Sequence, residues 1–247
     1  MNPLRFRLLQ ARAPDDLVKE EERASFIALL GSEPVCVESW DLLEGNTSFE
    51  RVTEGVDAVL VGGSGAFGVN DDVTWMRSFI DTLGSLADAG FPMFASCFGF
   101  QGLCAALGAQ VITDPDGAEV GTYSLTLTDS GRTDPLFRSL PERFLAQEGH
   151  KDRATRIPKG CTWLARSDRC PYQALRVGEA LVYATQFHPE LDDQTQRMRF
   201  SRYFELYKGI YGEARAREIL DEMRPSPEAN ALLAGFAQQV RAAKAGL

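Results

Sequence analysis

The sequence has no C-x-x-C pair and only two histidines, so it lacks the ligand spacing that is usual for a structural zinc site. Its five cysteines are an odd number, and no disulfide framework is expected among them. From these absences we expect neither a metal nor a cofactor.

Long apolar runs and basic clusters are also missing. No stretch approaches the roughly 18 consecutive apolar residues that a membrane helix needs, and the first residues lack the apolar core of a secretory signal. The formal net charge is −9, and no run rich in lysine or arginine occurs. Nucleic acid and anionic membranes are therefore not expected as partners, and the cytoplasm is the expected compartment. The oligomeric state is left open.

The 247 residues are 44% hydrophobic and 25% charged, which is an ordinary globular composition. Apolar runs alternate with amphipathic segments through the first half, and Asp71 or Asp72 is the expected N-cap of one helix. The expected strands are 4–12, 33–42, 56–63 and 91–96, and the expected helices are 14–31, 71–90 and 98–108. This alternation predicts an α/β protein with a mostly parallel, doubly wound sheet.

The second half changes character and predicts an antiparallel portion of the sheet. Gly178 marks an expected hairpin. The strand-like segments are 121–128, 142–152, 162–167, 172–177 and 179–187. We expect residues 1–192 to form the catalytic domain and residues 193–247 to be its C-terminal helical extension. Pro225 and Pro227 divide that extension into two helical stretches, which could cover the sheet, form a dimer contact or dock a partner.

Cys97 lies in the stretch FPMFASCFGFQGLCAALG, between a short apolar strand and a helix. Small residues surround it, which is the arrangement of a nucleophile elbow with cysteine in place of serine. The helix N-terminus would favour a thiolate, and the amide of Phe98 could point at a reacting oxygen. A buried and inert cysteine is the alternative.

His188 and Glu190 occur in ATQFHPEL, at the end of an expected strand. Residues two apart on an extended backbone face the same way, so Glu190 could hold one imidazole nitrogen while the other faces Cys97. A histidine with a purely structural role is the alternative.

The glycine-rich stretch VLVGGSGAFGV follows another buried strand. It lacks the phosphate-loop pattern G-x-x-x-x-G-K-[ST]. Two interpretations remain: a plain tight turn, or half of an oxyanion hole in which the amide of Gly63 joins that of Phe98.

Taken together, GGSG, SCFGFQ and QFHPE, in this order and spacing, resemble the class I glutamine amidotransferase family over roughly residues 55–191. Within the family, the chain looks most like the stand-alone relatives of the GMP synthetase amidotransferase domain. The resemblance implies a flavodoxin-like fold. It implies a Cys-His-Glu triad of Cys97, His188 and Glu190, with an oxyanion hole of the Gly63 and Phe98 amides. The substrate-binding residues that it implies are Gly65, Gln101, Gly149 and His150.

This chain departs from the family pattern at two positions. Ala95 replaces a glycine two residues before the nucleophile, and Ser64 replaces a proline in the glycine loop. Neither change removes a catalytic atom.

The resemblance implies a small-molecule substrate and leaves several functions open. A glutamine amidotransferase would release ammonia to a synthetase partner. A γ-glutamyl peptidase or γ-glutamyl amine hydrolase would act without one. A non-catalytic regulatory member of the fold is a third possibility, although it would be expected to lack a triad residue. Cys104 is expected in the core, and Trp75 either on the sheet or at the rim of the site.

Overall fold

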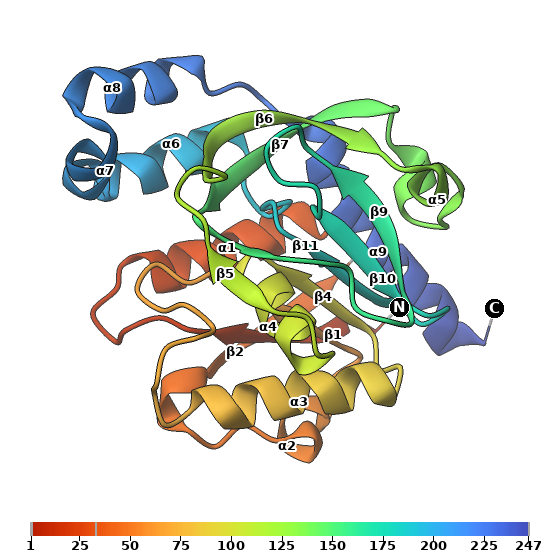
Figure 1. The fold of residues 1–247 in the computed structure, drawn as a ribbon. Coiled ribbons are helices and arrows are strands. Elements are labelled where there is room, and N and C mark those ends of the chain that lie inside the picture. Colours follow the sequence, from red (N-terminus) through yellow and green to blue (C-terminus); the bar gives the residue numbers. More distant parts are fainter. Residues whose placement is uncertain (1, 33, 247) are drawn as a thin grey trace.

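A computed structural model describes residues 2–32 and 34–246, and a nine-stranded sheet of order β2-β1-β3-β4-β11-β10-β9-β6-β7 runs through its centre (Figure 1). The first five strands in this order pair in parallel. They are β2 (Val35–Asp41), β1 (Leu4–Gln10), β3 (Ala58–Val61), β4 (Met93–Ser96) and β11 (Val182–Thr185). The predicted mostly parallel α/β sheet is thus confirmed.

The remaining strands pair antiparallel, as the sequence predicted. They are β10 (Ala174–Val177), β9 (Cys161–Arg166), β6 (Glu119–Leu127) and β7 (Arg143–His150). The sequence did not predict the small second sheet, in which β5 (Val111–Thr113) pairs with β8 (Asp152–Ala154).

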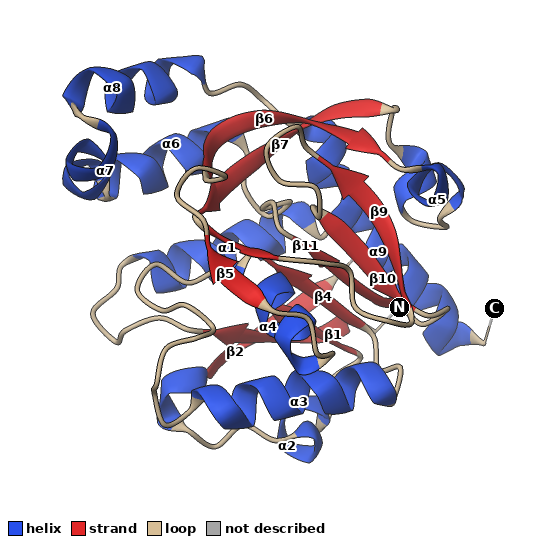
Figure 2. Ribbon diagram, in the orientation of Figure 1, coloured by secondary structure: helices blue, strands red, loops and turns tan. Residues whose placement is uncertain are grey.

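Helices cover both faces of the parallel half (Figure 2). On one face, α1 (Val18–Leu29) and α9 (Pro227–Ala245) pack together, and the rings of Phe236 and Phe94 lie 5.5 Å apart between centroids. On the other face lie α2 (Phe49–Thr53), α3 (Met76–Asp88) and α4 (Phe98–Ala106). Strands β3, β4 and β11 are buried at every residue because both of their faces are covered.

Three short helices form a separate group beside β6 and β7 (Figure 1). They are α6 (Asp193–Arg202), α7 (Phe204–Tyr211) and α8 (Glu213–Glu222). The sequence predicted one helical stretch here, which is wrong. The chain breaks at Tyr203 and again at Gly212, whose φ of 80° is outside the helical region. The remaining short elements are α5 (Asp129–Thr133), η1 (Leu42–Glu44) and η2 (Phe137–Ser139).

The predicted start of α3 is also wrong. The helix begins at Met76, and its N-cap position, Trp75, makes no side-chain cap. The side chain of Asp71 instead accepts a hydrogen bond from the amide of Gly68 at 2.9 Å and closes a turn in the preceding loop. Trp75 was expected either on the sheet or at the rim of the site. It is buried, and its ring packs edge-on against Phe67.

The C-terminal segment is part of the same packing. Helix α9 contributes Leu232, Leu233 and Phe236 to the core beneath the sheet. Among the described residues, no helix is both long enough and apolar enough to span a membrane. The boundary between residues 1–192 and 193–247 stays a prediction.

Candidate active site

Cys97 sits on the turn between β4 and α4 with φ 50° and ψ −99°. Among the described residues it is the only one other than glycine with a positive φ. Its amide donates to the carbonyl of Thr185 at 2.7 Å, which ties the turn to the end of β11. A non-glycine residue in this region is strained, and such strain is concentrated at functional sites. The elbow expected from the sequence is therefore present.

Gly99 makes the sharp turn possible. A Cβ atom at this position would lie 2.8 Å from the side chain of Val61 and 3.0 Å from Cβ of Ala95. Both distances are tighter than ordinary packing allows. Helix α4 can therefore begin directly above β3 only because residue 99 has no side chain.

The side chains of His188 and Glu190 are in contact as expected, but the backbone between them has a different conformation from the expected one. Glu190 Oε1 lies 2.6 Å from His188 Nδ1. The expected extended conformation is wrong, because the amide of Leu191 donates to the His188 carbonyl at 3.2 Å and closes a turn. The His188 amide donates to the Gln147 carbonyl at 2.9 Å, which ties this turn to β7.

The charges of the neighbours decide the protonation of His188. Burial lowers its pKa, but Glu190 and Cys97 together outweigh burial and raise the pKa to about 10. Burial likewise raises the pKa of Glu190, yet His188 and Arg199 bring it below its ordinary value. A protonated imidazole at neutral pH therefore stands between the carboxylate and the sulfur.

Cys97 interacts with this imidazolium, whereas burial dominates the pKa of three other cysteine thiols. Burial raises the pKa of the Cys161 thiol to about 11 and that of Cys170 to about 12. Cys104 is buried in the core, as expected, and burial raises the pKa of its thiol as well.

The amide of Gly63 makes a contact that the sequence did not suggest. It donates to Oε1 of Glu22 at 3.1 Å. Glu22 is fully buried on α1, where Arg12 Nη2 lies 2.9 Å from Oε1 and Gln10 Nε2 donates to Oε2 at 3.0 Å. A Cβ atom on Gly63 would come within 2.9 Å of His188 Cε1, so this glycine lies directly against the imidazole.

A cavity of about 360 Å³ opens over Cys97. The residues proposed from the sequence that line it are Gly65, Cys97, Phe98, Gln101, Gly149, His150 and His188. Gly63 and Glu190 lie behind its surface, where they contact Glu22 and His188.

The residues expected to bind substrate occupy distinct positions on the cavity wall. Gln101 Nε2 donates to the Asp152 carbonyl at 2.8 Å. A Cβ atom on Gly149 would lie 3.7 Å from His188 Nε2, so the β7 backbone runs beside the imidazole. His150 lines the cavity, while its Nδ1 lies 3.1 Å from the Asp152 carbonyl.

Helices α6 and α7 supply one wall of the cavity, a role that was not among the three considered from the sequence for the C-terminal extension. Phe200 and Tyr207 stack with their ring centroids 4.3 Å apart. Ile210 is 57% exposed at the rim. The wall consists of Gln196, Arg199, Phe200, Tyr203, Tyr207, Ile210 and Tyr211. No motif marks these residues, because their common property is only their position after folding.

Comparisons with known proteins agree with this geometry. Residues 36–206 match the family model described as glutamine amidotransferase class-I. A GMP synthase [glutamine-hydrolyzing] of Thermosipho africanus is 30% identical over 152 residues, which are 61% of this chain and 28% of that protein. A GMP synthase [glutamine-hydrolyzing] subunit from Methanocaldococcus jannaschii is 34% identical over 104 residues, 42% of this chain and 53% of that one. The chain thus spans about half or less of the length of these relatives.

Two solved structures share the fold. A glutamine amidotransferase of Thermotoga maritima superposes with a TM-score of 0.73 at 21% identity, covering 97% of this chain and 99% of that one. A putative GMP synthase subunit from Thermoplasma acidophilum gives 0.62 at 23% identity, covering 90% of this chain and 100% of that one. At these identities the likeness concerns the fold alone.

Proposed function

Because the chain belongs to the class I glutamine amidotransferase family, whose model matches residues 36–206, we propose that it hydrolyses glutamine to glutamate and ammonia. The reaction would pass through a γ-glutamyl thioester on Cys97. The observation that carries the proposal is the strained elbow of Cys97 beside a buried imidazolium, which Glu190 holds at 2.6 Å.

Acylation uses the pair of Cys97 and His188. The Cys97 thiolate attacks the γ-carbonyl carbon and forms the C–S bond, while the amide of Phe98 at the start of α4 faces the oxyanion. His188 then gives its proton to the departing nitrogen, the C–N bond breaks and ammonia leaves. Glu190 keeps Nδ1 protonated and fixes the ring, so that the other nitrogen serves the reaction.

Deacylation reverses the proton flow. Neutral His188 takes a proton from water, whose oxygen attacks the thioester carbon. The C–S bond breaks, glutamate leaves and the Cys97 thiolate is regenerated beside the imidazolium. For Gly63 to act as the second oxyanion donor, its N–H has to turn from Glu22 Oε1, where it donates now, toward the substrate.

Ammonia transfer to a synthetase partner belongs to this proposal. One relative is named as a subunit of a GMP synthase, and this chain matches 53% of that protein. Helices α6 and α7 line the cavity, and α9 packs beneath the sheet, so the C-terminal segment serves the same catalytic unit. The cavity over Cys97 would then be the source of the ammonia that a synthetase partner receives.

A second candidate is the hydrolysis of γ-glutamyl peptides or amines. The aromatic wall of α6 and α7, with Ile210 at its rim, provides apolar surface beyond that needed for departing ammonia. The bond changes are the same, except that a larger amine takes the proton from His188. Whether the protein prefers glutamine or a γ-glutamyl peptide or amine as substrate depends on which leaving group this wall binds better.

The test is glutamate release from free glutamine, γ-glutamyl dipeptides, glutathione and a γ-glutamyl amine. Cys97→Ala is expected to abolish all release, whereas Cys161→Ala, on the half-buried cysteine of β9, is expected to retain it. A preference for free glutamine supports the ammonia donor. A preference for a peptide or amine supports the second candidate, and release that survives in Cys97→Ala overturns both.

A further inference from the structure

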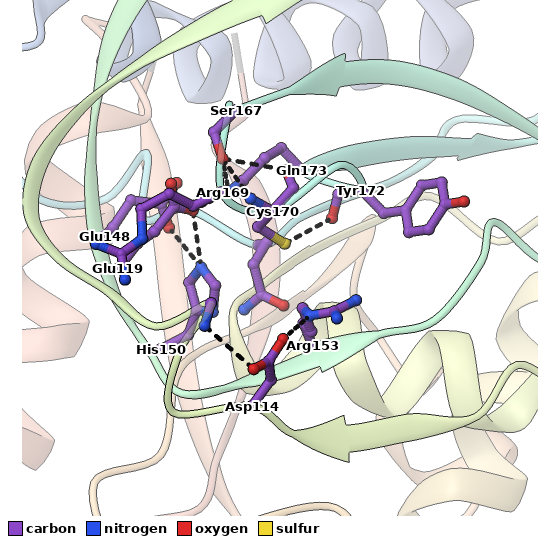
Figure 3. Close-up of polar contacts among 12 residues, drawn as sticks. Asp114, Glu119, Glu148, His150, Arg153, Ser167, Arg169, Cys170, Tyr172 and Gln173 are labelled. Carbon is purple, nitrogen blue, oxygen red and sulfur yellow. Dashed lines mark hydrogen bonds and ion pairs between the residues drawn. The ribbon is translucent and has the colours of Figure 1, made fainter.

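A second group of reactive side chains lies buried around His150, which is also part of the cavity lining (Figure 3). Glu119 comes from β6, Glu148 and His150 from β7, and Cys170 from the connection between β9 and β10. We call these four residues the Glu-His-Cys cluster. Three of them have no exposed surface, and His150 is 4% exposed. One ligand atom each from Glu119, His150 and Cys170 lies within 4.8 Å of the other two.

Several oxygens of the cluster lack a hydrogen-bond donor among the described residues. They are both carboxylate oxygens of Glu148 and Oε1 of Glu119. A buried carboxylate without donors is costly, and each such group in a folded protein calls for an explanation. One orphan oxygen, Oε2 of Glu148, and the second oxygen of Glu119 lie beside the same imidazole.

The tautomer of His150 determines whether this imidazole can donate a hydrogen bond to the two carboxylates. Nδ1 lies 3.1 Å from the Asp152 carbonyl, which can only accept, so Nδ1 carries a proton. In the neutral ring, Nε2 is then an acceptor. It faces Glu119 Oε2 at 3.2 Å and Glu148 Oε2 at 3.5 Å. Three acceptors therefore converge on one point, where a cation fits.

The nearby arginines are engaged elsewhere. Arg153 Nε pairs with Asp114 at 2.6 Å, and Arg169 donates to a backbone carbonyl at 2.6 Å. The described side chains thus leave the two carboxylates without a full positive counterpart other than a proton.

We propose that the cluster binds one zinc ion through the imidazole of His150, the thiolate of Cys170 and the carboxylate of Glu119, with Glu148 beside the ion. Imidazole, thiolate and carboxylate are all ligand types that zinc takes, and a water completes the tetrahedron. With bonds of about 2.0–2.1 Å, the edge of a tetrahedron is about 3.3 Å. The distance of 3.2 Å from Nε2 to Glu119 Oε2 matches that edge. The Cys170 sulfur lies within 4.8 Å of the ligand atoms of Glu119 and His150, and it takes the third corner, about 3.5 Å from each, by moving roughly 1.3 Å or less.

The surroundings are those of a metal site. A metal-bound histidine commonly donates its other N–H to a carbonyl, as His150 does to Asp152. Gln173 Nε2 donates to Glu119 Oε2 at 2.5 Å and orients that carboxylate. On binding, the Cys170 thiol and any protonated Glu148 release their protons to solvent.

The zinc ion would tie together β6, β7 and the connection that carries Cys170. Glu148 and His150 flank Gly149, whose backbone runs beside His188. The site would therefore stabilise one wall of the catalytic cavity without touching the reacting atoms. It does not depend on the function proposed above. The ligands come from three separate segments, which is why the absence of C-x-x-C spacing led to the opposite expectation.

The first test is a Co²⁺ titration of chelator-treated, full-length protein carrying Cys97→Ala, which removes the cavity thiol. Tetrahedral d–d bands and a thiolate-to-cobalt charge-transfer band are expected to saturate at one equivalent and to disappear on adding Zn²⁺. Adding Cys170→Ala is expected to abolish the charge-transfer band, and adding Cys161→Ala to leave it. An unchanged band without Cys170, or no saturation at one equivalent, overturns the proposal.

A second measurement does not depend on the folding of a cysteine variant. X-ray absorption of zinc-loaded wild-type protein is expected to show one sulfur and three nitrogen or oxygen neighbours. Glu148→Gln, nearly the same in shape, is expected to weaken zinc binding at least 10-fold while circular dichroism shows an intact fold. A zinc shell without sulfur, or unchanged affinity in Glu148→Gln, overturns the proposal.

Discussion

Glu190 Oε1 lies 2.6 Å from His188 Nδ1, and both side chains are buried. This contact, with Cys97 on the other side, keeps the imidazole protonated, because the pKa of His188 rises to about 10 from an ordinary 6.5. Glu190→Gln removes the larger of the two charges that raise it. The expected result is a loss of glutaminase kcat of about 10³- to 10⁴-fold, by analogy with triads that lose their carboxylate.

The pH profile separates this role from a merely structural one. The proton donor is lost as pH rises through the pKa of His188 in the free enzyme, so the alkaline limb of kcat/KM is expected near pH 10 in the wild type. In Glu190→Gln the limb should move to lower pH, since the variant lacks the carboxylate that raises this pKa. An alkaline limb that stays in place would contradict the assignment, and Glu190→Asp should restore part of both kcat and the profile.

The raised pKa of His188 also predicts how the free energy of unfolding depends on pH. A histidine with a raised pKa contributes stability that is fully present below its unfolded pKa near 6.5 and is lost as pH rises toward about 10. The difference in free energy of unfolding between wild type and Glu190→Gln should therefore shrink between pH 7 and pH 10. Urea denaturation at several pH values measures it.

The residues that sequence reasoning could place were those whose chemistry lies in short local patterns. Cys97 stands at a strand-to-helix junction with small neighbours, and His188 and Glu190 are two positions apart. Glu22 escaped notice, because it lies 41 positions from Gly63 and meets it only when α1 packs beside β3. Nothing in the sequence near Gly63 could indicate that its amide donates to a carboxylate.

The elements of the fold also fall into those that local patterns predicted and those that they missed. Continuous apolar runs predicted β3 and β4, since strands buried on both faces need no alternation. The pairing of β5 with β8 was missed because each strand has three residues and no periodicity. The breaks between α6, α7 and α8 fall at Tyr203 and Gly212, and the sequence missed them because an amphipathic pattern continues across both positions and a single glycine can be tolerated inside a helix.

The close packing at the elbow predicts that alanine substitutions at two helical glycines change protein stability in opposite directions. Gly99→Ala is expected to destabilise the protein by about 1–3 kcal/mol, because its Cβ would meet Val61 at 2.8 Å. Gly84→Ala is the matched control: its Cβ would find only Ala106 at 3.8 Å, and alanine favours a helix by about 0.5–1 kcal/mol. Chemical denaturation of both variants checks the opposite signs. Equal effects would remove the steric explanation of the elbow.

The rim of the cavity makes a prediction about specificity. Ile210 is 57% exposed on the cavity wall formed by α6 and α7, where the leaving group of a γ-glutamyl amine is proposed to lie. Ile210→Ala is expected to lower kcat/KM for a γ-glutamyl amine with an apolar leaving group about 5-fold relative to free glutamine, since each lost CH₂ contact contributes up to about 0.8 kcal/mol. Met198→Ala on α6, 45% exposed but outside this cavity, is the control. An unchanged ratio in Ile210→Ala would show that leaving groups do not reach this wall.

The buried ion pair behind Gly63 makes the last prediction. Arg12 Nη2 lies 2.9 Å from Glu22 Oε1, and both side chains are almost completely enclosed. Arg12→Met leaves a buried carboxylate without its cation, which is expected to cost about 3–5 kcal/mol of unfolding free energy at pH 7. The exposed pair of Arg77 and Asp81 is the control, and Arg77→Met is expected to produce no measurable change.

A double-mutant cycle decides whether the pair itself carries this effect. Glu22→Gln in the Arg12→Met background removes the stranded charge while keeping an acceptor for the Gly63 amide. The double variant is therefore expected to be more stable than Arg12→Met alone, with a coupling energy of at least about 1 kcal/mol. Strict additivity would mean that Arg12 stabilises the protein through its packing, and that Glu22 holds the Gly63 amide without needing a cation beside it.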